Sequence, residues 1–496
     1  MRVVVVGDIG WRYLYHLGDE AMTEAAIAML RERGVEDITL VAGDPAVASA
    51  FYGLPAVARV GFNGRWSRDG NDGHLRGVDE TLAAGEFEAG SVYAAIRDAD
   101  AVVIAGGGNM SSTHYHHLYE RLAITRIAAH VGTPLYVTSQ TVGPALLDGD
   151  RDKVAEIAAY ATCFGAREAT THALVSGLVE DASRVVHTLD DAAMLDADGP
   201  AVARVASFDL PSRYVAASFS NGHGTTWPDA DTYYRAMARL SDSLAERCDV
   251  HVVLAPHAGS FDEARTTRDQ DSNAAIERHS TSGRVRALPM ITAREDVALI
   301  EGAALSLSTR YHPAVFAPAV GTPAGAIAPS FYSSVRMRGA LGNVGLEKWV
   351  LTTESMPVAA DAFAELLDAP EAARAHLTSA RPATVSFQHR WWDAIVESIE
   401  TGIWTSPGDL PSVPSLEPTG AWSGVNEASY PLWDKYTEQI ELAGMWRSEA
   451  RRLTVEHEGL PELRSQARDG RRLRRRRVVR LADAVGRARR DLTGTA

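Results

Sequence analysis

The chain has little cysteine and no long apolar segment. Cys163 and Cys248 are the two cysteines among 496 residues, and both stand in apolar contexts. Two distant thiols exclude a disulfide framework and indicate a reducing compartment. No run of about eighteen apolar residues occurs, so we predict no transmembrane helix. The first apolar run is short and is soon followed by Asp8, which excludes a secretory signal. These absences predict a cytoplasmic protein.

Two recognition motifs are also missing. The first apolar strand is followed by Gly7-Asp8-Ile9-Gly10, which does not continue as the dinucleotide-binding pattern G-x-G-x-x-G. His114, His116 and His117 are too closely spaced to converge as a helical zinc site, and no acid or cysteine stands at a matching spacing. We therefore predict no cofactor and no metal.

Positive charge is scarce except at the carboxyl end. The formal net charge is −15, but residues 461–496 contain twelve Arg against four Asp or Glu. This tail carries about +8, which leaves about −23 on the rest of the chain. The acidic body argues against general nucleic-acid binding, and we expect no specific nucleic-acid partner.

What is present is an alternation of strand and helix patterns. The length predicts two or three domains. In the first two hundred residues, short apolar runs alternate with helical patterns, which predicts a parallel sheet flanked by helices. The predicted strands are Val3–Val6, Ile38–Val41, Ala101–Ile104, Leu135–Thr138, Cys163–Ala166 and Val185–Thr188, and the helices include Glu20–Arg33 and Tyr115–Val131.

A second alternating set begins after Pro200. It predicts a second α/β domain, so that residues 1–203 and 204–384 form two lobes with a ligand cleft where the carboxyl ends of their strands face each other. The predicted strands are Tyr214–Phe219, Val250–Ala255, Val285–Ala287, Leu305–Ser308, Ala324–Ile327 and Trp349–Leu351, and the helices include Asp229–Arg247, Asp262–Arg278 and Ala293–Gly302.

The last hundred residues follow another pattern. We predict an amphipathic helix over 385–404, a Pro/Ser/Gly-rich linker over 405–428, and a helical, arginine-rich region over 429–496. The fold class is therefore α/β with a helical C-terminal extension.

Glycine-rich turns follow several strands of the first lobe. Gly18 and Asp19 open the first helix, where free backbone N–H groups favour an anion; Asp19 is either an N-cap or first-turn acid, or a ligand contact. Gly106, Gly107 and Gly108 let a ligand approach the backbone closely, and Asn109 follows them. Further polar candidates at the same edge of the sheet are Gln140, Arg167 and Asp191.

Basic side chains follow the strands of the second lobe. Arg310 offers a planar, charged fork for carboxylate or phosphate, and His312 can exchange a proton near neutral pH. Together these two residues predict a site that binds an anion and transfers a proton. His257 follows an earlier strand, and Arg336 or Arg338 follows a later one.

The order of these motifs resembles the polysaccharide pyruvyl transferase family over about Met1 to Leu351. That resemblance implies two Rossmann-like lobes in a glycosyltransferase B-like arrangement. It also implies transfer of the enolpyruvyl group of phosphoenolpyruvate onto two sugar hydroxyls of a cell-surface glycan or its precursor, forming a pyruvate ketal. The matching segments are Gly18-Asp19-Glu20-Ala21, Gly106-Gly107-Gly108-Asn109, Ser139 to Pro144, Ala166-Arg167-Glu168, Asp190-Asp191-Ala192 and Arg310-Tyr311-His312.

Such a donor suggests roles for the candidate residues. Arg167 and Arg310 would bind its carboxylate and phosphate, His312 would act as general acid, and Asp19 or Asp191 would act as base. The substrate-binding candidates are Arg167, Gly18, Gly106, Gly107, Gly108, Asn109, Gln140, His257 and Arg336.

The chain departs from the family pattern at three places. An aromatic-rich insert, Trp11 to Leu17, lengthens the first loop and either lines an acceptor-sugar platform or merely packs. Glu168 stands where the family has aspartate, and Arg336 replaces a lysine.

Other functions stay open at this point. A nucleotide-sugar-dependent glycosyltransferase and a non-catalytic assembly protein are compatible with the same two-lobed fold. For the arginine-rich tail we predict an anionic membrane surface as partner, which would make the protein peripheral at the inner face of the membrane. The alternatives are contact with a polymer or nucleic acid, and a tail that is solvated or folded onto the acidic body.

Overall fold

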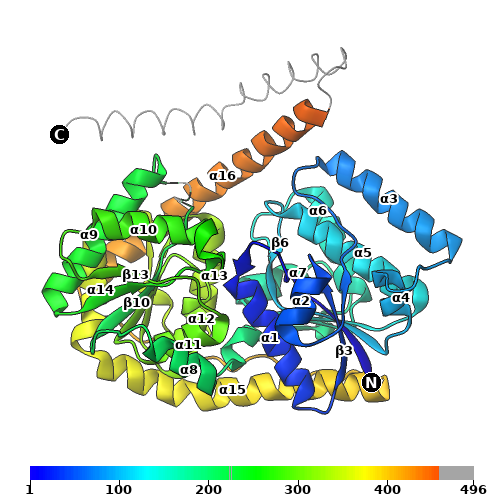
Figure 1. Ribbon diagram of the computed structural model, residues 1–496, viewed down its shortest axis with the longest axis horizontal. Helices are drawn as coiled ribbons and strands as arrows, with labels where there is room; N and C mark the ends of the chain where they lie inside the picture. Colours follow the sequence, from blue (N-terminus) through cyan, green and yellow to red (C-terminus); the bar gives the residue numbers. More distant parts are fainter. Residues whose placement is uncertain (223, 225, 457–496) are drawn as a thin grey trace.

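The computed structural model describes residues 1–222, 224 and 226–456. Two lobes lie side by side, and each has a parallel sheet with helices on its faces (Figure 1). The prediction of two α/β lobes followed by helices is confirmed for the described residues. The predicted helix and tail beyond residue 456 lie outside them.

The first lobe contains an eight-stranded sheet with the order β4-β3-β1-β5-β7-β8-β9, and β6 pairs with β7. Its central strands β1 and β5 are buried apolar runs, as expected for a parallel sheet covered on both faces. The bounds are β1 Arg2–Val6, β3 Asp37–Ala42, β4 Ala56–Ala58, β5 Ala101–Ile104, β6 Gly107–Met110, β7 Leu135–Val142, β8 Cys163–Ala166 and β9 Val185–His187.

The second lobe repeats this topology with the order β13-β11-β10-β14-β15-β16. In both sheets the strand order reverses beside the lobe's first strand, between β1 and β5 and between β10 and β14. Ligands bind at such reversal points in open α/β sheets. The bounds are β10 Tyr214–Ser218, β11 His251–Leu254, β13 Val285–Ala287, β14 Leu305–Ser308, β15 Ala324–Ala328 and β16 Val350–Thr352.

Helices cover both sheets. Those of the first lobe are α1 Leu17–Arg31, α2 Pro45–Tyr52, α3 Arg68–Ala84, α4 Val92–Arg97, α5 Tyr115–Val131, α6 Asp148–Tyr160 and α7 Ala169–Ser176. Those that follow are α8 Gly199–Ala206, α9 Ala230–Cys248, α10 Asp269–His279, α11 Ala293–Glu301, α12 Pro313–Val320, α13 Phe331–Gly342, α14 Ala359–Asp368, α15 Pro370–Thr401 and α16 Trp422–Glu456.

The second lobe begins earlier than the predicted boundary at residue 204. Helix α8 packs on α11, and its Ala201 and Val205 are buried. Ala192 and Leu195 also belong to the second lobe's core cluster. The apolar side chains that precede the first strand of the second sheet therefore cover that sheet rather than the first.

The aromatic-rich insert crosses to the second lobe. Its β2, Tyr15–His16, pairs antiparallel with β12, Ala258–Gly259. Tyr15 is buried, and its hydroxyl accepts a hydrogen bond from the backbone N–H of Ala293 at 3.2 Å. The insert thus ties the lobes together next to the start of α1.

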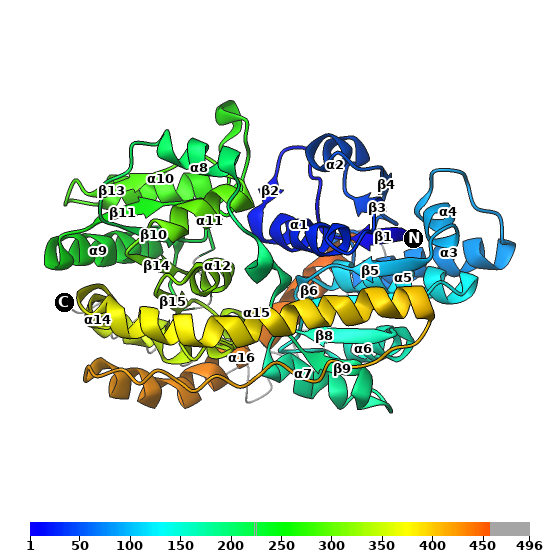
Figure 2. The same ribbon diagram turned by 90° about the horizontal axis from the view of Figure 1, so that it is seen from below.

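The helix predicted from residue 385 is the second half of a longer one. Helix α15 begins at Pro370 and continues through Pro382 to Thr401 (Figure 2). It runs from the second lobe back to the first, where Trp391 and Trp392 are fully buried against the first sheet. Their burial explains why this helix returns to the first lobe.

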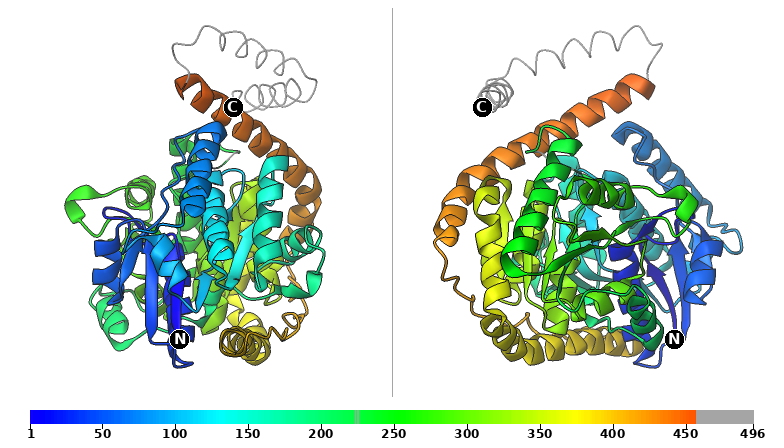
Figure 3. Two further views of the ribbon diagram at one scale, coloured as in Figure 1. Left: turned by 90° about the vertical axis from the view of Figure 1, so that its right-hand side faces the viewer. Right: turned by 60° about the vertical axis from the view of Figure 1, so that its left-hand side comes forward.

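The predicted linker also ends earlier than residue 428. Helix α16 begins at Trp422, whose indole Nε1 donates to Glu365 at 2.6 Å. Asn426 bonds the backbone of Val350 and Thr352, so these residues dock on the edge of the second sheet. From there α16 extends towards α3 of the first lobe (Figure 3). None of the helices in the described part of the chain is long and apolar enough to cross a membrane.

Candidate active site between the two lobes

The candidate site lies at the carboxyl ends of both sheets, where the lobes meet. The first lobe supplies Gly108 from β6 and Arg167, which directly follows β8. The second lobe supplies His312 before α12 and Arg336 from α13. Residues far apart in the sequence are therefore brought together by the strand ends.

Gly18 and His312 make the closest approach between the lobes. A Cβ atom placed on Gly18 would lie 2.0 Å from Nδ1 of His312, so the imidazole rests on the backbone of α1's first turn. His312 is the N-cap residue of α12, and Pro313 is the first residue of that helix. This packing requires glycine at position 18, because no side chain fits beneath the imidazole ring of His312.

Arg167 is fully buried and held by acidic neighbours. Its Nη1 lies 2.5 Å from Oδ2 of Asp190, and its Nε lies 3.2 Å from Oε1 of Glu168. Nε also donates to the Thr141 hydroxyl at 2.8 Å. The remaining nitrogen, Nη2, is buried without a partner. Nη2 is thus held in place by the rest of the guanidinium but makes no hydrogen bond of its own.

This Nη2 atom meets Arg336 above Gly108. A Cβ atom on Gly108 would lie 2.6 Å from Nη1 of Arg336 and 2.8 Å from Nη2 of Arg167. Across residues 1–222, 224 and 226–456, Arg336 forms no ion pair, and its buried Nε has no hydrogen-bond partner. Two guanidinium groups therefore converge on one point. Arg167 is paired there with Asp190 and Glu168, whereas no ion pair offsets the charge of Arg336 in the described part of the chain.

Two tyrosines support these guanidiniums. The Tyr311 ring lies 4.1 Å from Cζ of Arg167 and 5.0 Å from Cζ of Arg336, while the Tyr332 ring lies 3.9 Å from the latter. The Tyr332 hydroxyl donates to the carbonyl oxygen of Gly108. Cation–π contacts of this kind orient an arginine without neutralising it.

His312 faces the same charges. Burial lowers its pKa well below the ordinary 6.5, and the positive charges of Arg167, His257, Arg336 and Arg310 add to the effect. Its Nε2 is buried without a hydrogen bond and lies 3.9 Å from Oδ2 of Asp190. At neutral pH the ring is therefore uncharged, and its Nε2 is available for a hydrogen bond.

Arg310 is committed to another partner. Its guanidinium makes a two-point ion pair with the fully buried Asp269, at 2.8 Å through Nε and 2.5 Å through Nη2. The same carboxylate accepts from the backbone N–H groups of Asn221 and His257. Arg310 therefore holds two loops of the second lobe, and Asp269 offsets its charge.

The two neighbouring aspartates differ in what they contact. Asp191 is completely buried and accepts from Thr138, Gln388 and Trp392 at 2.5–2.8 Å, so it fastens α15 to the first lobe. Burial raises its pKa to about 6. Asp190 instead lies between Arg167 and His312. In the Asp190-Asp191 motif, Asp191 therefore holds α15 in place, whereas Asp190 faces the candidate site.

The three glycines have separate neighbours. A Cβ atom on Gly106 would lie 2.9 Å from the sulfur of Met22, and one on Gly107 would lie 3.2 Å from both Asn109 Oδ1 and Gln140 Oε1. Both amide oxygens are buried without partners. Gln140 is otherwise fixed by donating to the carbonyl oxygens of Ala105 and Thr138.

His257 lies deeper in the second lobe. Its Nε2 is 2.8 Å from Oδ2 of Asp296, although the two atoms are not aligned for a hydrogen bond. Its carbonyl oxygen accepts from the backbone N–H of Leu17. It anchors the first turn of α1 through its backbone.

Asp19 lies in the first turn of α1, where its carboxylate is partly exposed and 3.6 Å from Nδ1 of His16. The helix's N-cap residue is His16, so of the two positions considered for Asp19 the first-turn position is the correct one. Nε2 of His16 is buried without a partner. Asp19 therefore remains a group that can accept a proton at the cleft.

A further polar cluster surrounds Asp8 at the end of β1. Trp11 donates to Asp8 at 3.3 Å, and Nε2 of His117 lies 3.5 Å from the same carboxylate. His117 Nδ1 and Arg121 Nε are buried without partners. This Asp8 cluster joins the arginine site through His114, whose ring centre is 6.1 Å from that of Tyr332.

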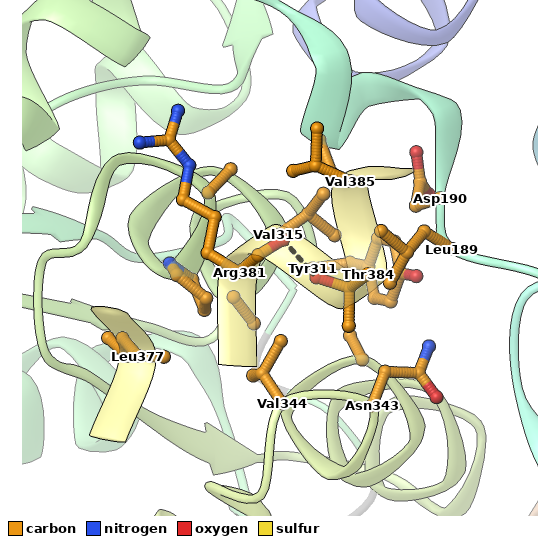
Figure 4. Close-up of a pocket in the computed structure, with 15 residues that line it drawn as sticks. Leu189, Asp190, Tyr311, Val315, Asn343, Val344, Leu377, Arg381, Thr384 and Val385 are labelled. Carbon is orange, nitrogen blue, oxygen red and sulfur yellow. Dashed lines mark hydrogen bonds between the residues drawn. The ribbon is translucent and has the colours of Figure 1, made fainter. Parts of the chain in front are cut away.

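A small cavity of about 40 Å³ lies behind Asp190 and Tyr311 (Figure 4). Its walls are mostly apolar and include Val315, Val344 and Val385. At this volume it has space for water but not for a sugar or a three-carbon phosphate ester. A second cavity, of about 240 Å³, borders Ser212 and Gly302 near the amino ends of the second sheet and touches no candidate residue.

Sequence reasoning missed three contributors to this site. Asp190, Tyr311 and Tyr332 were not among the candidate residues. Asp190 and Asp191 cannot be told apart by charge, and only the contacts of Asp190 with Arg167 and His312 place it in the site. The signal for Tyr311 and Tyr332 was their position directly after a strand end. In the described part of the chain, no three His, Cys, Asp or Glu side chains are grouped as metal ligands.

The fold is shared with known structures. A Listeria monocytogenes protein assigned as a UDP-N-acetylglucosamine 2-epimerase superposes with a TM-score of 0.54 at 13% identity, covering 83% of this chain and 99% of its own. S. aureus MnaA in complex with UDP gives 0.52 at 11% identity, with 83% and 100% covered. The predicted glycosyltransferase B-like arrangement is confirmed by these neighbours. At such identities they show the fold alone.

Sequence comparisons give the family. No curated protein sequence matches the chain. The family model described as polysaccharide pyruvyl transferase matches residues 16–330, which is more than half of the chain and includes Gly18, Arg167 and His312. Members of this family are transferases that act in polysaccharide biosynthesis. The chain belongs to the polysaccharide pyruvyl transferase family.

Proposed function

We propose that this enzyme transfers the enolpyruvyl group of phosphoenolpyruvate to two hydroxyls of a glycan or glycan precursor. The observation that carries the proposal is the convergence of Arg167 Nη2 and Arg336 Nη1 above Gly108, opposite a neutral His312. Phosphoenolpyruvate carries a carboxylate and a phosphate, and forked guanidiniums bind both groups well.

The proposed reaction conserves atoms and protons. The C3 methylene of the donor takes up a proton, and a sugar hydroxyl oxygen bonds to C2 as it loses its own proton. The C2–O bond to phosphate then breaks, and a second hydroxyl oxygen bonds to C2. One hydroxyl proton replaces the proton given to C3, and the other leaves with phosphate.

His312 is the proposed general acid. Burial and then the surrounding cations lower the pKa of His312, and a bound multiply charged anion would offset the cations and raise that pKa. Asp190, at 3.9 Å, is placed to stabilise the protonated ring. Donor binding would thereby favour protonation of His312, which then gives this proton to the donor's methylene.

Asp19 is the proposed base, since its partly exposed carboxylate borders the cleft while Asp191 is enclosed. The Asp8 cluster offers hydrogen-bonding groups to the acceptor, and Trp11 presents an indole beside it. These groups favour a sugar acceptor next to the donor site. Arg310 acts on the geometry of the second lobe rather than on the donor.

The proposal is tested by supplying purified protein with phosphoenolpyruvate and a panel of glycan acceptors. We expect release of inorganic phosphate only when an acceptor is present. In mass spectrometry the acceptor's mass should increase by that of the pyruvate group attached as a ketal. Consumption of a UDP-sugar without use of phosphoenolpyruvate would contradict the proposal and favour a glycosyltransferase. Donor binding without turnover on any acceptor would favour an assembly role.

A further inference from the structure

Helix α5 carries a buried arginine that has no ion pair in the described part of the chain. Arg121 is 2% exposed, and its Nε is enclosed without a hydrogen-bond partner. Within residues 1–222, 224 and 226–456 its guanidinium makes neither an ion pair nor a hydrogen bond. Buried charges are normally paired, because a charge removed from water is stabilised only by a close counter-charge and hydrogen bonds. Arg121 therefore lacks the partner that a buried guanidinium normally has.

The carboxylates near Arg121 bind other groups. Glu120 accepts hydrogen bonds at 2.6–3.2 Å from the backbone N–H groups of residues 60–62. Asp8 lies 4.0 Å from the guanidinium of Arg59. Burial lowers the pKa of Arg121, and these two carboxylates oppose the shift without cancelling it. Their charges act on Arg121 from a distance and leave its N–H groups unsatisfied.

His117 stands one helical turn before Arg121, on the same face of α5. Its Nδ1 is buried without a partner. Its Nε2 lies 3.5 Å from Oδ2 of Asp8, and a carboxylate at that place favours a proton on Nε2, which makes Nδ1 a hydrogen-bond acceptor. Burial, and then the charges of His116 and Arg121, lower the pKa of His117, so its ring is uncharged at neutral pH. We call Arg121 and His117 the α5 pair.

The α5 pair lies on the first-lobe side of the cleft. Helix α5 follows β6 after a short loop, so its first turns stand at the carboxyl edge of the first sheet. The ring centre of His114, the N-cap residue of α5, is 6.5 Å from that of His117 and 6.1 Å from that of Tyr332 in the second lobe. The carboxylate of Asp19 acts on the pKa of both members of the pair. The pair is therefore close to the proposed base and separated from the donor site by His114.

We propose that the α5 pair is a second oxyanion subsite, which binds a phosphate or carboxylate group carried by the acceptor sugar. Arg121 donates to the oxyanion as a permanently charged group, and Nδ1 of His117 accepts from a hydroxyl of the same sugar. The donor's own anionic groups are bound by Arg167 and Arg336. Assignment of the oxyanion to the acceptor rests on the proposed function, whereas oxyanion binding at Arg121 does not.

The test is titration calorimetry of the full chain with glucose 6-phosphate, glucuronate and glucose as probes. We expect the two anionic sugars to bind roughly tenfold or more tightly than glucose. Arg121→Met should abolish this preference. Arg126→Met is the matched control and should keep it, because Arg126 lies on the same helix but pairs with Asp79 and Glu156. Arg336→Ala should keep it as well.

Three binding results would overturn the proposal. The first is that neither anionic sugar binds more tightly than glucose. The second is a preference that depends on Arg336 and not on Arg121, since the sugars would then occupy the donor site. The third is a rise in the dissociation constant of phosphoenolpyruvate that is as large in Arg121→Met as in Arg336→Ala, since Arg121 would then bind the donor.

A stability measurement separates binding from a structural role. Because Arg121 is buried without an ion pair, its replacement by the neutral methionine should leave the free energy of unfolding in urea unchanged or raise it. A clear fall would mean that Arg121 supports the fold, and would overturn the proposal. Phosphate release from phosphoenolpyruvate is measured separately. Sugar binding that depends on Arg121 without any turnover would support the subsite and contradict only the proposed function.

Discussion

Arg167 in the first lobe and Arg310 in the second each lie just beyond a strand of a parallel sheet, yet their contacts differ. Arg167 keeps one buried nitrogen without a partner and shares its position above Gly108 with Arg336. Arg310 uses its guanidinium for a two-point ion pair with the buried Asp269. Because Arg167 keeps an unpartnered nitrogen and Arg336 has no ion pair among the described residues, we propose that these two arginines bind the donor's anionic groups, whereas Arg310 holds loops of the second lobe together.

The different contacts of Arg167 and Arg310 also separate donor binding from the stability of the second lobe. The proposed anion site depends on a contact between the lobes, because Arg336 comes from the second lobe and Gly108 from the first. The Arg310–Asp269 pair lies within the second lobe and joins two of its loops. Donor affinity should therefore respond to one arginine and stability to the other.

The largest expected effect is that of Arg336→Ala on donor use. Losing a partly buried cation from an anion site costs 2–5 kcal/mol, so kcat/KM for phosphoenolpyruvate should fall by about a thousandfold. Steady-state kinetics with varied donor measures this. Arg338→Ala is the matched control, since Arg338 pairs with Asp434 and points away from the site. Equal losses in both variants would contradict the assignment.

Arg310→Ala should act mainly on stability. It leaves the Asp269 carboxylate buried and unpaired, which should lower the free energy of unfolding by about 3 kcal/mol. Urea denaturation gives this value, and the donor KM of the folded variant should change less than threefold. A large rise in KM with unchanged stability would instead make Arg310 a donor ligand.

Gly108→Ala should weaken the donor site without a general loss of stability. The added methyl group would occupy the space between Arg336 Nη1 and Arg167 Nη2 and displace at least the more flexible Arg336. A displacement of this size should raise the donor dissociation constant by roughly thirtyfold. Titration calorimetry measures it. Gly77→Ala in α3, where nothing lies within 4 Å, is the control and should leave binding unchanged.

The smallest effect concerns pH. The pKa of His312 lies well below 6.5 in the folded protein, so below pH 6.5 the unfolded chain binds a proton that the folded chain excludes. Stability contributed by the neutral ring is present above pH 6.5 and is lost as pH falls, by at most about 1.4 kcal/mol per pH unit.

His312→Gln should remove this part of the pH dependence. The change in unfolding free energy from pH 5 to pH 7 should be less positive in the variant than in the parent protein. Asp191, with its pKa raised to about 6, acts in the opposite direction, because its contribution is lost as pH rises through 6. That contribution is present in both proteins and cancels. A variant with the full pH dependence of the parent would contradict a depressed His312 pKa.

Much of this organisation follows from local sequence. Apolar runs located the principal strands of both sheets, and Gly132 stopped α5 at Val131 as predicted. Strand β6 was missed because Gly107-Gly108-Asn109-Met110 has no strand-like alternation, and it forms through pairing with β7. The helix predicted from residue 385 begins instead at Pro370, and it continues through Pro382 to the part that buries Trp391 and Trp392.

The site residues show where such reasoning stops. Placing candidates at strand ends works because parallel strands end at one edge of a sheet. Whether a guanidinium is free depends on partners distant in sequence: Asp269 lies forty-one residues from Arg310, and Asp190 twenty-three from Arg167. Local patterns carry no information about these pairings. Sequence therefore located the arginines, and packing determines which of them can bind an anion.

The most direct test is a crystal structure of the enzyme soaked with phosphoenolpyruvate. The account predicts density for the donor above Gly108, with its anionic groups within hydrogen-bond distance of Arg167 Nη2 and the Arg336 guanidinium, its methylene facing His312, and the Arg310–Asp269 pair intact. A donor bound to Arg310 with that pair broken, or one bound outside the cleft, would contradict it.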